Sequence, residues 1–176
     1  MAATSKTFAP VWREYRRVPL HKCPPQRRDW LLDRGSLTKR LISRSKGDFR
    51  VNVCRQRWAK PRLDEIRLLK IPSRQYALIR EVELICRGEI WVTARSIIPV
   101  ATLTGAERQL ACLGERPLGE FLFKSKTMRR GPLQIATLKD SPGASIEESI
   151  SARRSIFYIH GKPILVSEFF LAPVFK

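Results

Sequence analysis

The chain has 176 residues, a formal net charge of +18 and 43% hydrophobic residues. That hydrophobic content excludes an intrinsically disordered chain, and the length favours one domain over two of ordinary size. No apolar run is long enough to span a bilayer and no signal-peptide core is present, so we expect a cytoplasmic protein.

The positive charge is compatible with three classes of partner. Basic chains bind nucleic acids, are attracted to anionic membranes, or act on anionic substrates. Here the 34 Lys and Arg residues are spread along the chain, without a basic arm or a nucleic-acid motif of aromatic and basic residues. We therefore interpret the charge as a basic solvated surface. We expect a monomer that binds small molecules and no nucleic acid.

Neither a metal nor a cofactor is predicted. The four cysteines, at positions 23, 54, 86 and 112, are far apart, and no histidine stands at ligand spacing. The sequence has no Gly-rich phosphate loop, no Gly-x-Ser-x-Gly motif and no His-Glu-x-x-His motif. Any chemistry must therefore come from binding, from shape and from a carboxyl group.

The first part of the chain predicts a lead-in segment and two short helices. Residues 1–20 are basic and show no periodicity, so we expect a loosely ordered segment before a single domain of residues 21–176. Helices are predicted over 26–34 and over 37–45, the second capped by Ser36. The start of this second helix leaves backbone N–H groups free to meet an anion.

A strand and a hairpin follow. Alternating apolar residues predict a strand over 49–53, and residues 60–73, with two prolines, predict a connection with at most a short helical piece. The apolar runs 76–86 and 89–99 flank Arg87-Gly88. This pattern indicates a β-hairpin with a two-residue loop.

This hairpin carries a charge among apolar side chains. Leu78, Arg80, Val82 and Leu84 share one face of the first strand. A two-residue loop places Arg95 directly across from Arg80. Like charges that face each other across a sheet are unfavourable unless an anion lies between or beside them. We therefore expect both arginines to bind a small anion.

The next stretch predicts two helices, a strand and a loop. The Thr-x-x-Glu spacing at 104–107 is that of a capping box and opens a first helix. A proline then begins a second helix over 118–124, whose first turn also exposes backbone amides. A strand is expected at about 133–137 and a polar loop over 139–149.

The last hairpin also carries a charged residue among apolar side chains. Its two β-rich runs flank Gly161-Lys162, which predicts a tight turn. In the second run, alternate side chains from Ile164 to Phe170 point one way, and the one charged residue among them is Glu168. A carboxylate on such a face is costly unless it is paired or faces a cavity. The alternatives are a glutamate turned to solvent from an edge strand, or an ion pair with Arg80.

Antiparallel hairpins with helices between them predict an α+β fold on a single antiparallel sheet. The three unusual charges lie on inward faces, and two helix starts with free amides accompany them. We therefore expect a cavity that binds a small anion through its arginines and hydrogen-bonds the other end of the ligand through Glu168.

Five motifs follow one another in the chain: Trp30–Leu41 (WLLDRGSLTKRL), Arg80-Glu81-Val82, Ala94–Pro99 (ARSIIP), Pro117–Phe123 (PLGEFLF), and Gly161 to Leu171. Together they resemble the bacterial chorismate–pyruvate lyases, over residues 30 to 173. The resemblance implies an antiparallel sheet whose inserted helices form flaps over an internal ligand cavity. It also implies a carbon–oxygen lyase without a cofactor, which converts chorismate to 4-hydroxybenzoate and pyruvate for ubiquinone biosynthesis.

The resemblance further implies the roles of four residues. Arg80 binds the ring carboxylate, Glu168 bonds the hydroxyl at the opposite end of the ring, and both are expected to be catalytic. The backbone amides of Leu37 and Leu118 complete the contacts to the carboxylate; some members have methionine in place of Leu37. To these we add Arg95, as a partner of the enolpyruvyl carboxylate or of the charge that develops when the ether bond breaks.

Two other functions stay open. The same fold serves as an effector-sensing domain in some transcription regulators, so the chain could be a non-catalytic binder of small anions. It could also be a basic nucleic-acid-binding module, which salt-dependent DNA binding without chorismate turnover would indicate.

Overall fold

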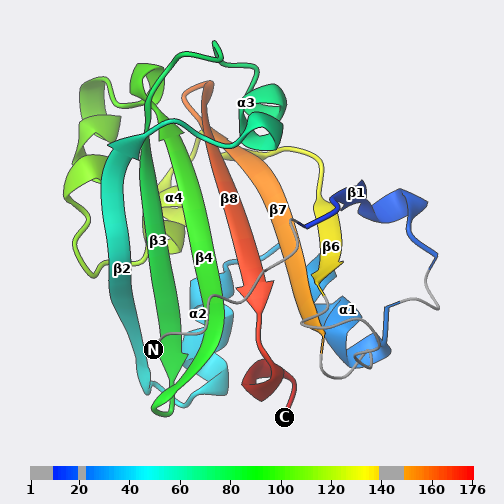
Figure 1. Ribbon diagram of the computed structural model, residues 1–176. Helices are drawn as coiled ribbons and strands as arrows, with labels where there is room; N and C mark the ends of the chain where they lie inside the picture. The colour runs from blue at the N-terminus through cyan, green and yellow to red at the C-terminus, as the bar shows by residue number, and fades with distance from the viewer. Residues whose placement is uncertain (1–9, 20–22, 139–148) are drawn as a thin grey trace, which may run out of the picture.

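The computed structural model describes residues 10–19, 23–138 and 149–176 (Figure 1). In this part of the chain eight strands form one antiparallel sheet, in the order β1-β6-β7-β8-β4-β3-β2, and β5 pairs with β7 off this path. The expected α+β fold on a single antiparallel sheet is therefore confirmed. The strands are β1 Arg13–Glu14, β2 Phe49–Ala59, β3 Ala77–Cys86, β4 Glu89–Pro99, β5 Arg129–Arg130, β6 Gln134–Leu138, β7 Ile150–Ile159 and β8 Lys162–Phe170.

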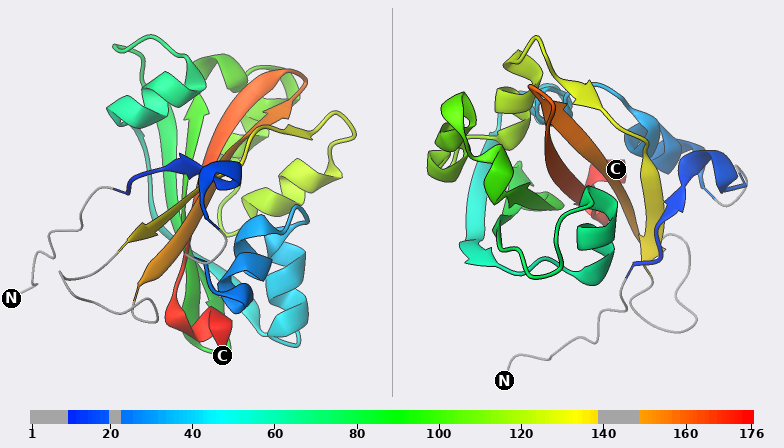
Figure 2. Two further views of the ribbon diagram at one scale, coloured as in Figure 1. Left: turned by 90° about the vertical axis from the view of Figure 1, so that its right-hand side faces the viewer. Right: turned by 90° about the horizontal axis from the view of Figure 1, so that it is seen from above.

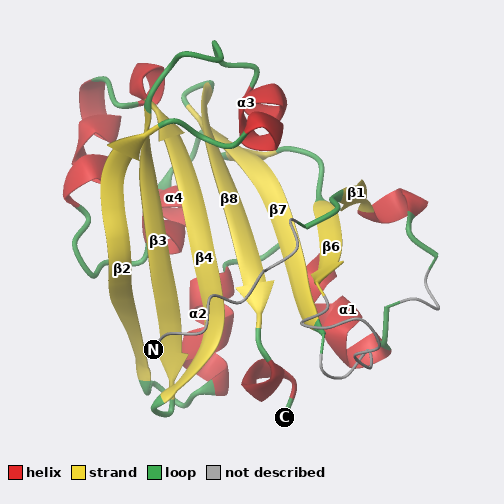
Figure 3. Ribbon diagram, in the orientation of Figure 1, coloured by secondary structure: helices red, strands yellow, loops and turns green. Residues whose placement is uncertain are grey.

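Short helices lie on both faces of the sheet. Helices α1, α2 and α4 lie behind it in Figure 1, whereas α3 lies in front, and the side view in Figure 2 separates the two groups. Figure 3 shows the same arrangement with the helices in red and the strands in yellow. Helices α1, α2 and α4 lie where the sequence predicted helices. The α-helices are α1 Pro25–Leu32, α2 Leu37–Arg44, α3 Leu63–Leu69 and α4 Leu118–Lys124; the 3-10 helices are η1 Tyr15–Arg17, η3 Val100–Thr102, η4 Gly105–Cys112 and η5 Ala172–Phe175.

Two-residue turns close both long hairpins. The turns are Arg87-Gly88 and His160-Gly161, so the second lies one residue before the predicted Gly161-Lys162. All four turn residues have positive φ angles, from 49° to 77°. Positive φ at both central positions is what a type I′ turn requires, and its twist matches that of the flanking strands.

A bulge in β4 decides which of its side chains face the back of the sheet. The pairing of β3 with β4 shifts by one residue next to Leu84, and Trp91 is the extra residue of β4. Beyond this point Arg80 pairs with Ser96 and not with Arg95. Because a one-residue shift turns every following side chain to the other face, the prediction that Arg95 faces Arg80 was wrong.

Behind the sheet, the apolar core is divided into two clusters. One packs α1 and α2 against the sheet, and the other packs η4 and α4 against it. Three charged residues, Arg80, Arg153 and Glu168, lie on the strands between them. The first cluster includes Trp30, Leu31, Leu37, Leu41, Val51 and Leu84, and the second includes Leu78, Ile98, Leu110, Leu122, Ile159 and Ile164.

The described part of the N-terminal segment lies along the edge of the sheet. Strand β1 pairs with β6, and the Trp12 ring packs edge-on against Phe169 with ring centroids 6.1 Å apart. The Arg154 guanidinium lies 4.5 Å from the centroid of the Trp12 ring. These contacts place residues 12–17 at the periphery of the fold, against the edge of the sheet. Residues 1–9, 20–22 and 139–148 lie outside the described residues, and the last range includes all of the predicted polar loop over 139–149 except Ser149.

The predicted capping box at residues 104–107 does not form, and η4 is a 3-10 helix. Instead of capping the helix, the buried Glu107 carboxylate lies 2.7 Å from Lys162 Nζ and 2.7 Å from His160 Nδ1. The contact with Lys162 and, next, that with His160 hold the pKa of Glu107 at about 2, against an ordinary value of 4.5. Glu107 thus ties η4 to the start of β8.

We expect the Glu107→Gln variant to lose stability in a pH-dependent way. The pKa of Glu107 is lowered in the folded state, so its contribution is complete above the unfolded value of 4.5 and is lost as the pH falls towards 2. At pH 7 the variant should lose roughly 2 kcal/mol, because a buried charged hydrogen-bond partner is removed. Urea unfolding at pH 7, 5 and 3 measures this difference, with the exposed Glu115→Gln as control. A difference that stays constant from pH 7 to pH 3 would show that the ion pairs are not its source.

Candidate active site

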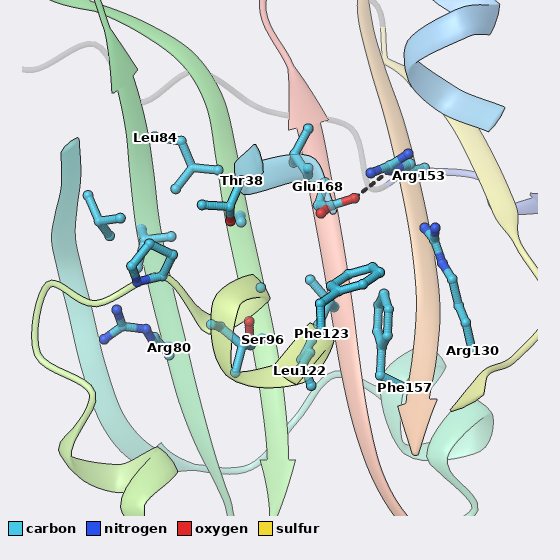
Figure 4. A pocket seen from close by; sticks show the side chains of 18 of the residues that line it. Thr38, Arg80, Leu84, Ser96, Leu122, Phe123, Arg130, Arg153, Phe157 and Glu168 are labelled. Atoms are coloured by element: carbon cyan, nitrogen blue, oxygen red, sulfur yellow. Dashed lines mark hydrogen bonds and ion pairs between the residues drawn. The ribbon is translucent and has the colours of Figure 1, made fainter. Parts of the chain in front are cut away.

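A cavity lies between the back of the sheet and the first turns of α2 and α4 (Figure 4). It contains about 620 Å³ not filled by protein atoms, including its opening to solvent, which is in the range of small-molecule sites. Its polar side chains are Thr38, Arg80, Ser96, Arg130, Arg153 and Glu168. Its larger apolar side chains are Leu37, Val51, Val82, Leu84, Leu118, Leu122, Phe123, Phe157 and Val166. Few polar groups in an apolar wall suit a ring with polar substituents.

Arg80 lies at one end of the cavity and is 2% exposed. Its Nη1 donates to Gln56 Oε1 at 3.0 Å, and its Nη2 donates to the carbonyls of Gly114 at 2.7 Å and Arg116 at 3.3 Å. All three acceptors are neutral, and no carboxylate among the described residues forms an ion pair with Arg80. Burial lowers the pKa of Arg80. A buried cation without a counter-ion is a place where an anionic ligand gains strong hydrogen bonds.

Glu168 and Arg153 form an ion pair towards the other end of the cavity (Figure 4). Arg153 is 1% exposed, and its Nε donates to Glu168 Oε2 at 2.5 Å. The Glu168 side chain is 12% exposed, so it is not turned to solvent, and its partner is Arg153 and not Arg80. Its second oxygen, Oε1, accepts no hydrogen bond within the described residues and is available to a ligand hydroxyl.

The first residues of α2 and α4, Leu37 and Leu118, both line the cavity. The first N–H groups of a helix have no partner within the helix, so their amides are available to a ligand. The two helix starts approach closely at Gly119, where a Cβ atom would lie 2.7 Å from Thr38 Oγ1. Glycine at this position therefore allows the two helices to cover the cavity together.

No set of three or more His, Cys, Asp and Glu side chains in the described part of the chain is arranged to hold a metal ion. Within the same residues, no helix has the length and apolar character needed to cross a membrane.

Comparison with known proteins identifies the family. The family model described as chorismate lyase matches residues 11–176. The chain belongs to the chorismate lyase family. A protein from Methylococcus capsulatus named "probable chorismate pyruvate-lyase" is 46% identical over 152 residues, which cover 82% of this chain and 94% of the relative. One of the same name from Aromatoleum aromaticum is 39% identical over 172 residues, covering 92% of each chain.

Solved structures that resemble the chain show the fold alone. PhnF from Mycobacterium smegmatis aligns with a TM-score of 0.58 at 11% sequence identity, over 82% of this chain and 67% of that one. The effector binding domain of the Bacillus subtilis trehalose repressor aligns with a TM-score of 0.50 at 10% identity, over 72% of this chain and 93% of that one.

Four of the five site residues predicted for this chorismate lyase family member lie around one cavity: Leu37, Arg80, Leu118 and Glu168. The fifth does not. Arg95 lies on the opposite face, where its Nε is 2.7 Å from Glu65 Oε1 and its Nη1 is 2.6 Å from Glu81 Oε1. The Trp91 bulge turns Arg95 away, and its contacts hold α3 on the front of the sheet.

Sequence reasoning missed two arginines of this cavity. The observed turn at His160-Gly161 pairs Arg153 directly with Glu168, whereas a turn at the predicted Gly161-Lys162 would pair Glu168 with Ser155. Arg130 gave no signal, because β5 has only two residues and therefore no alternation to interpret.

Gly119→Ala should weaken ligand binding at this site. The added methyl group would lie within 3 Å of Thr38 Oγ1 and push α4 away from α2. Overpacking of this kind costs about 1–3 kcal/mol, so we expect about tenfold weaker binding of 4-hydroxybenzoate by calorimetry. The double variant Thr38→Ala/Gly119→Ala should recover most of that loss, because the clashing oxygen is gone. Wild-type affinity in the single variant would contradict the close approach.

Proposed function

We propose that the protein is a chorismate pyruvate-lyase, which converts chorismate to 4-hydroxybenzoate and pyruvate without a metal or organic cofactor, as a committed step of ubiquinone biosynthesis. The observation that carries the proposal is the cavity, with a buried Arg80 that has no ion pair among the described residues at one end and Glu168, held by Arg153, towards the other. Membership of the chorismate lyase family supports the reaction class.

The chemistry of the substrate fits this arrangement. Chorismate is a dianion with one carboxylate on the ring and another on the enolpyruvyl ether, which lies next to the ring hydroxyl. In the reaction the bond between the ring carbon and the ether oxygen breaks, the carbon that bears the hydroxyl loses its proton, and the enolpyruvyl methylene gains a proton to give pyruvate. The ring becomes aromatic, which supplies much of the driving force. The protein then has mainly to hold the reactive conformer.

One end of the cavity binds the ring carboxylate, and the other end binds the ring hydroxyl. Arg80 holds the ring carboxylate through its remaining N–H groups, and the amides of Leu37 and Leu118 complete the contacts. At the other end, Glu168 Oε1 accepts the hydrogen bond of the ring hydroxyl and is positioned to take the proton from the adjacent carbon. The ion pair with Arg153 fixes the orientation of this carboxylate.

A second candidate function is a non-catalytic sensor of small anions. The fold shared with the trehalose repressor's effector binding domain favours it. A sensor would bind 4-hydroxybenzoate or chorismate in the same cavity and release no pyruvate.

A turnover assay tests the proposal. Purified protein with chorismate and EDTA should release pyruvate and 4-hydroxybenzoate in equal amounts. Glu168→Gln keeps the shape of the side chain but removes its charge, so we expect kcat to fall about 100-fold, the usual size of a general-base contribution. Wild-type turnover in this variant would rule out proton transfer by Glu168. Heat stabilisation by 4-hydroxybenzoate without any turnover in the wild type would instead favour the sensor.

Arg80→Ala should abolish tight product binding. Loss of a charge-assisted contact in a buried site predicts a Kd for 4-hydroxybenzoate that is about 100-fold higher or more. The matched control is Arg95→Ala, which removes a half-buried arginine from the other face of the same sheet. It should lower the melting temperature but leave the Kd within a few-fold of wild type. Equal effects of both variants on the Kd would argue against Arg80 as the carboxylate anchor.

A further inference from the structure

Arg130 is the third arginine that lines the cavity, after Arg80 and Arg153, and it has no part in the proposed binding of the ring carboxylate and hydroxyl. It lies on β5, directly across from Phe157, and its guanidinium is 5.1 Å from the centroid of the Phe157 ring. Its Nε donates to Ser155 Oγ at 3.2 Å and its Nη1 to the carbonyl of Asp33 at 3.1 Å. Both acceptors are neutral. Within the described residues, Nη2 has no hydrogen bond and Arg130 has no ion pair.

The surroundings of Arg130 favour an anion. Burial and, next, the nearby charge of Arg153 lower the pKa of Arg130 to about 10, so the Arg130 guanidinium is still charged at pH 7. Glu168 is the one carboxylate that is paired with either of them in the described part of the chain. This end of the cavity therefore has an excess of positive charge, which a second carboxylate would balance.

Arg130 also borders a second space. Together with Thr127, Arg129, Gly131, Tyr158, His160 and Gly161, it lines a cleft on the outer side of β5 and of the β7–β8 turn. Arg130 therefore lies between the cavity and this cleft.

We propose that Arg130 binds the second carboxylate of the substrate, that of the enolpyruvyl group. The inference rests on the proposed function, in which Arg80 holds the ring carboxylate and Glu168 holds the hydroxyl. The enolpyruvyl ether is attached next to that hydroxyl, so its carboxylate must lie near Glu168 and far from Arg80. Figure 4 shows Arg130 at this end of the cavity. Because 4-hydroxybenzoate lacks this carboxylate, Arg130 distinguishes the substrate from the product.

Arg130→Gln tests the inference through the difference between two ligands. We expect kcat/KM for chorismate to fall about 30-fold or more, through loss of a charged hydrogen bond, whereas the Kd for 4-hydroxybenzoate should change less than about threefold. Arg130→Lys should recover part of the loss. As control, Arg50→Gln removes an exposed arginine of β2 and should change neither value. Because a misfolded cavity would weaken both ligands, a parallel loss for chorismate and 4-hydroxybenzoate would overturn the proposal, and so would an unchanged kcat/KM.

Calorimetry separates this inference from the proposed function. If the wild-type protein releases no pyruvate, the lyase proposal fails, but chorismate and 4-hydroxybenzoate can still be compared as ligands. Weaker binding of chorismate alone in Arg130→Gln would then still support the second carboxylate subsite. Equal binding of chorismate by the wild type and the variant would reject it.

Discussion

The buried guanidinium of Arg153 links strand β7 to strand β8 and to the end of helix α1, beside the cavity. It lies on β7, bonds Glu168 on β8, and donates to the carbonyls of Trp30 and Asp33 at 2.8 and 2.7 Å, at the end of α1. The Asp33 carboxylate in turn accepts from the Gly35 amide at 2.7 Å, which shapes the elbow before α2. A buried charge with several fixed partners tolerates little displacement, because any lost contact leaves it uncompensated. The position of α2 over the cavity therefore follows from the ion pair beneath it.

The cavity exists because charged residues interrupt an apolar face. Helices α1 and α2 pack on one cluster and η4 and α4 on another, and between them the strands present Arg80, Arg153 and Glu168, which cannot be covered by apolar side chains without a large cost. Of the cations that line the cavity, Arg80 and Arg130 have only neutral acceptors in the part of the chain that the structure describes. In the account proposed here the two carboxylates of chorismate match these two cations. The product matches only Arg80, which leaves Arg130 in the state it has in the free protein.

Much of the fold was predictable from local patterns, and what was not depended on long-range pairing. Alternation placed Arg80 and Glu168 on inward faces, and helix-start signals located Leu37 and Leu118. The bulge at Trp91 has no local signature in the sequence. Counting residue pairs outwards from the Arg87-Gly88 turn therefore put Arg95 on the wrong face of the sheet. The capping box at 104–107 failed for a similar reason, because its glutamate binds Lys162 and His160, which are remote in sequence. Arg153 was missed because the last turn was predicted one residue too late, and Arg130 was missed because it lies on a strand of only two residues.

A crystal structure of the protein with 4-hydroxybenzoate bound is the most direct test of the account, because the cavity has arginines at both ends and a ligand could bind in either orientation. We expect the carboxylate within about 3 Å of the Arg80 guanidinium and the hydroxyl at the same distance from Glu168, with Arg130 making no contact with the carboxylate. A reversed ligand, with its carboxylate on Arg130, would contradict the assignment of both ends of the cavity.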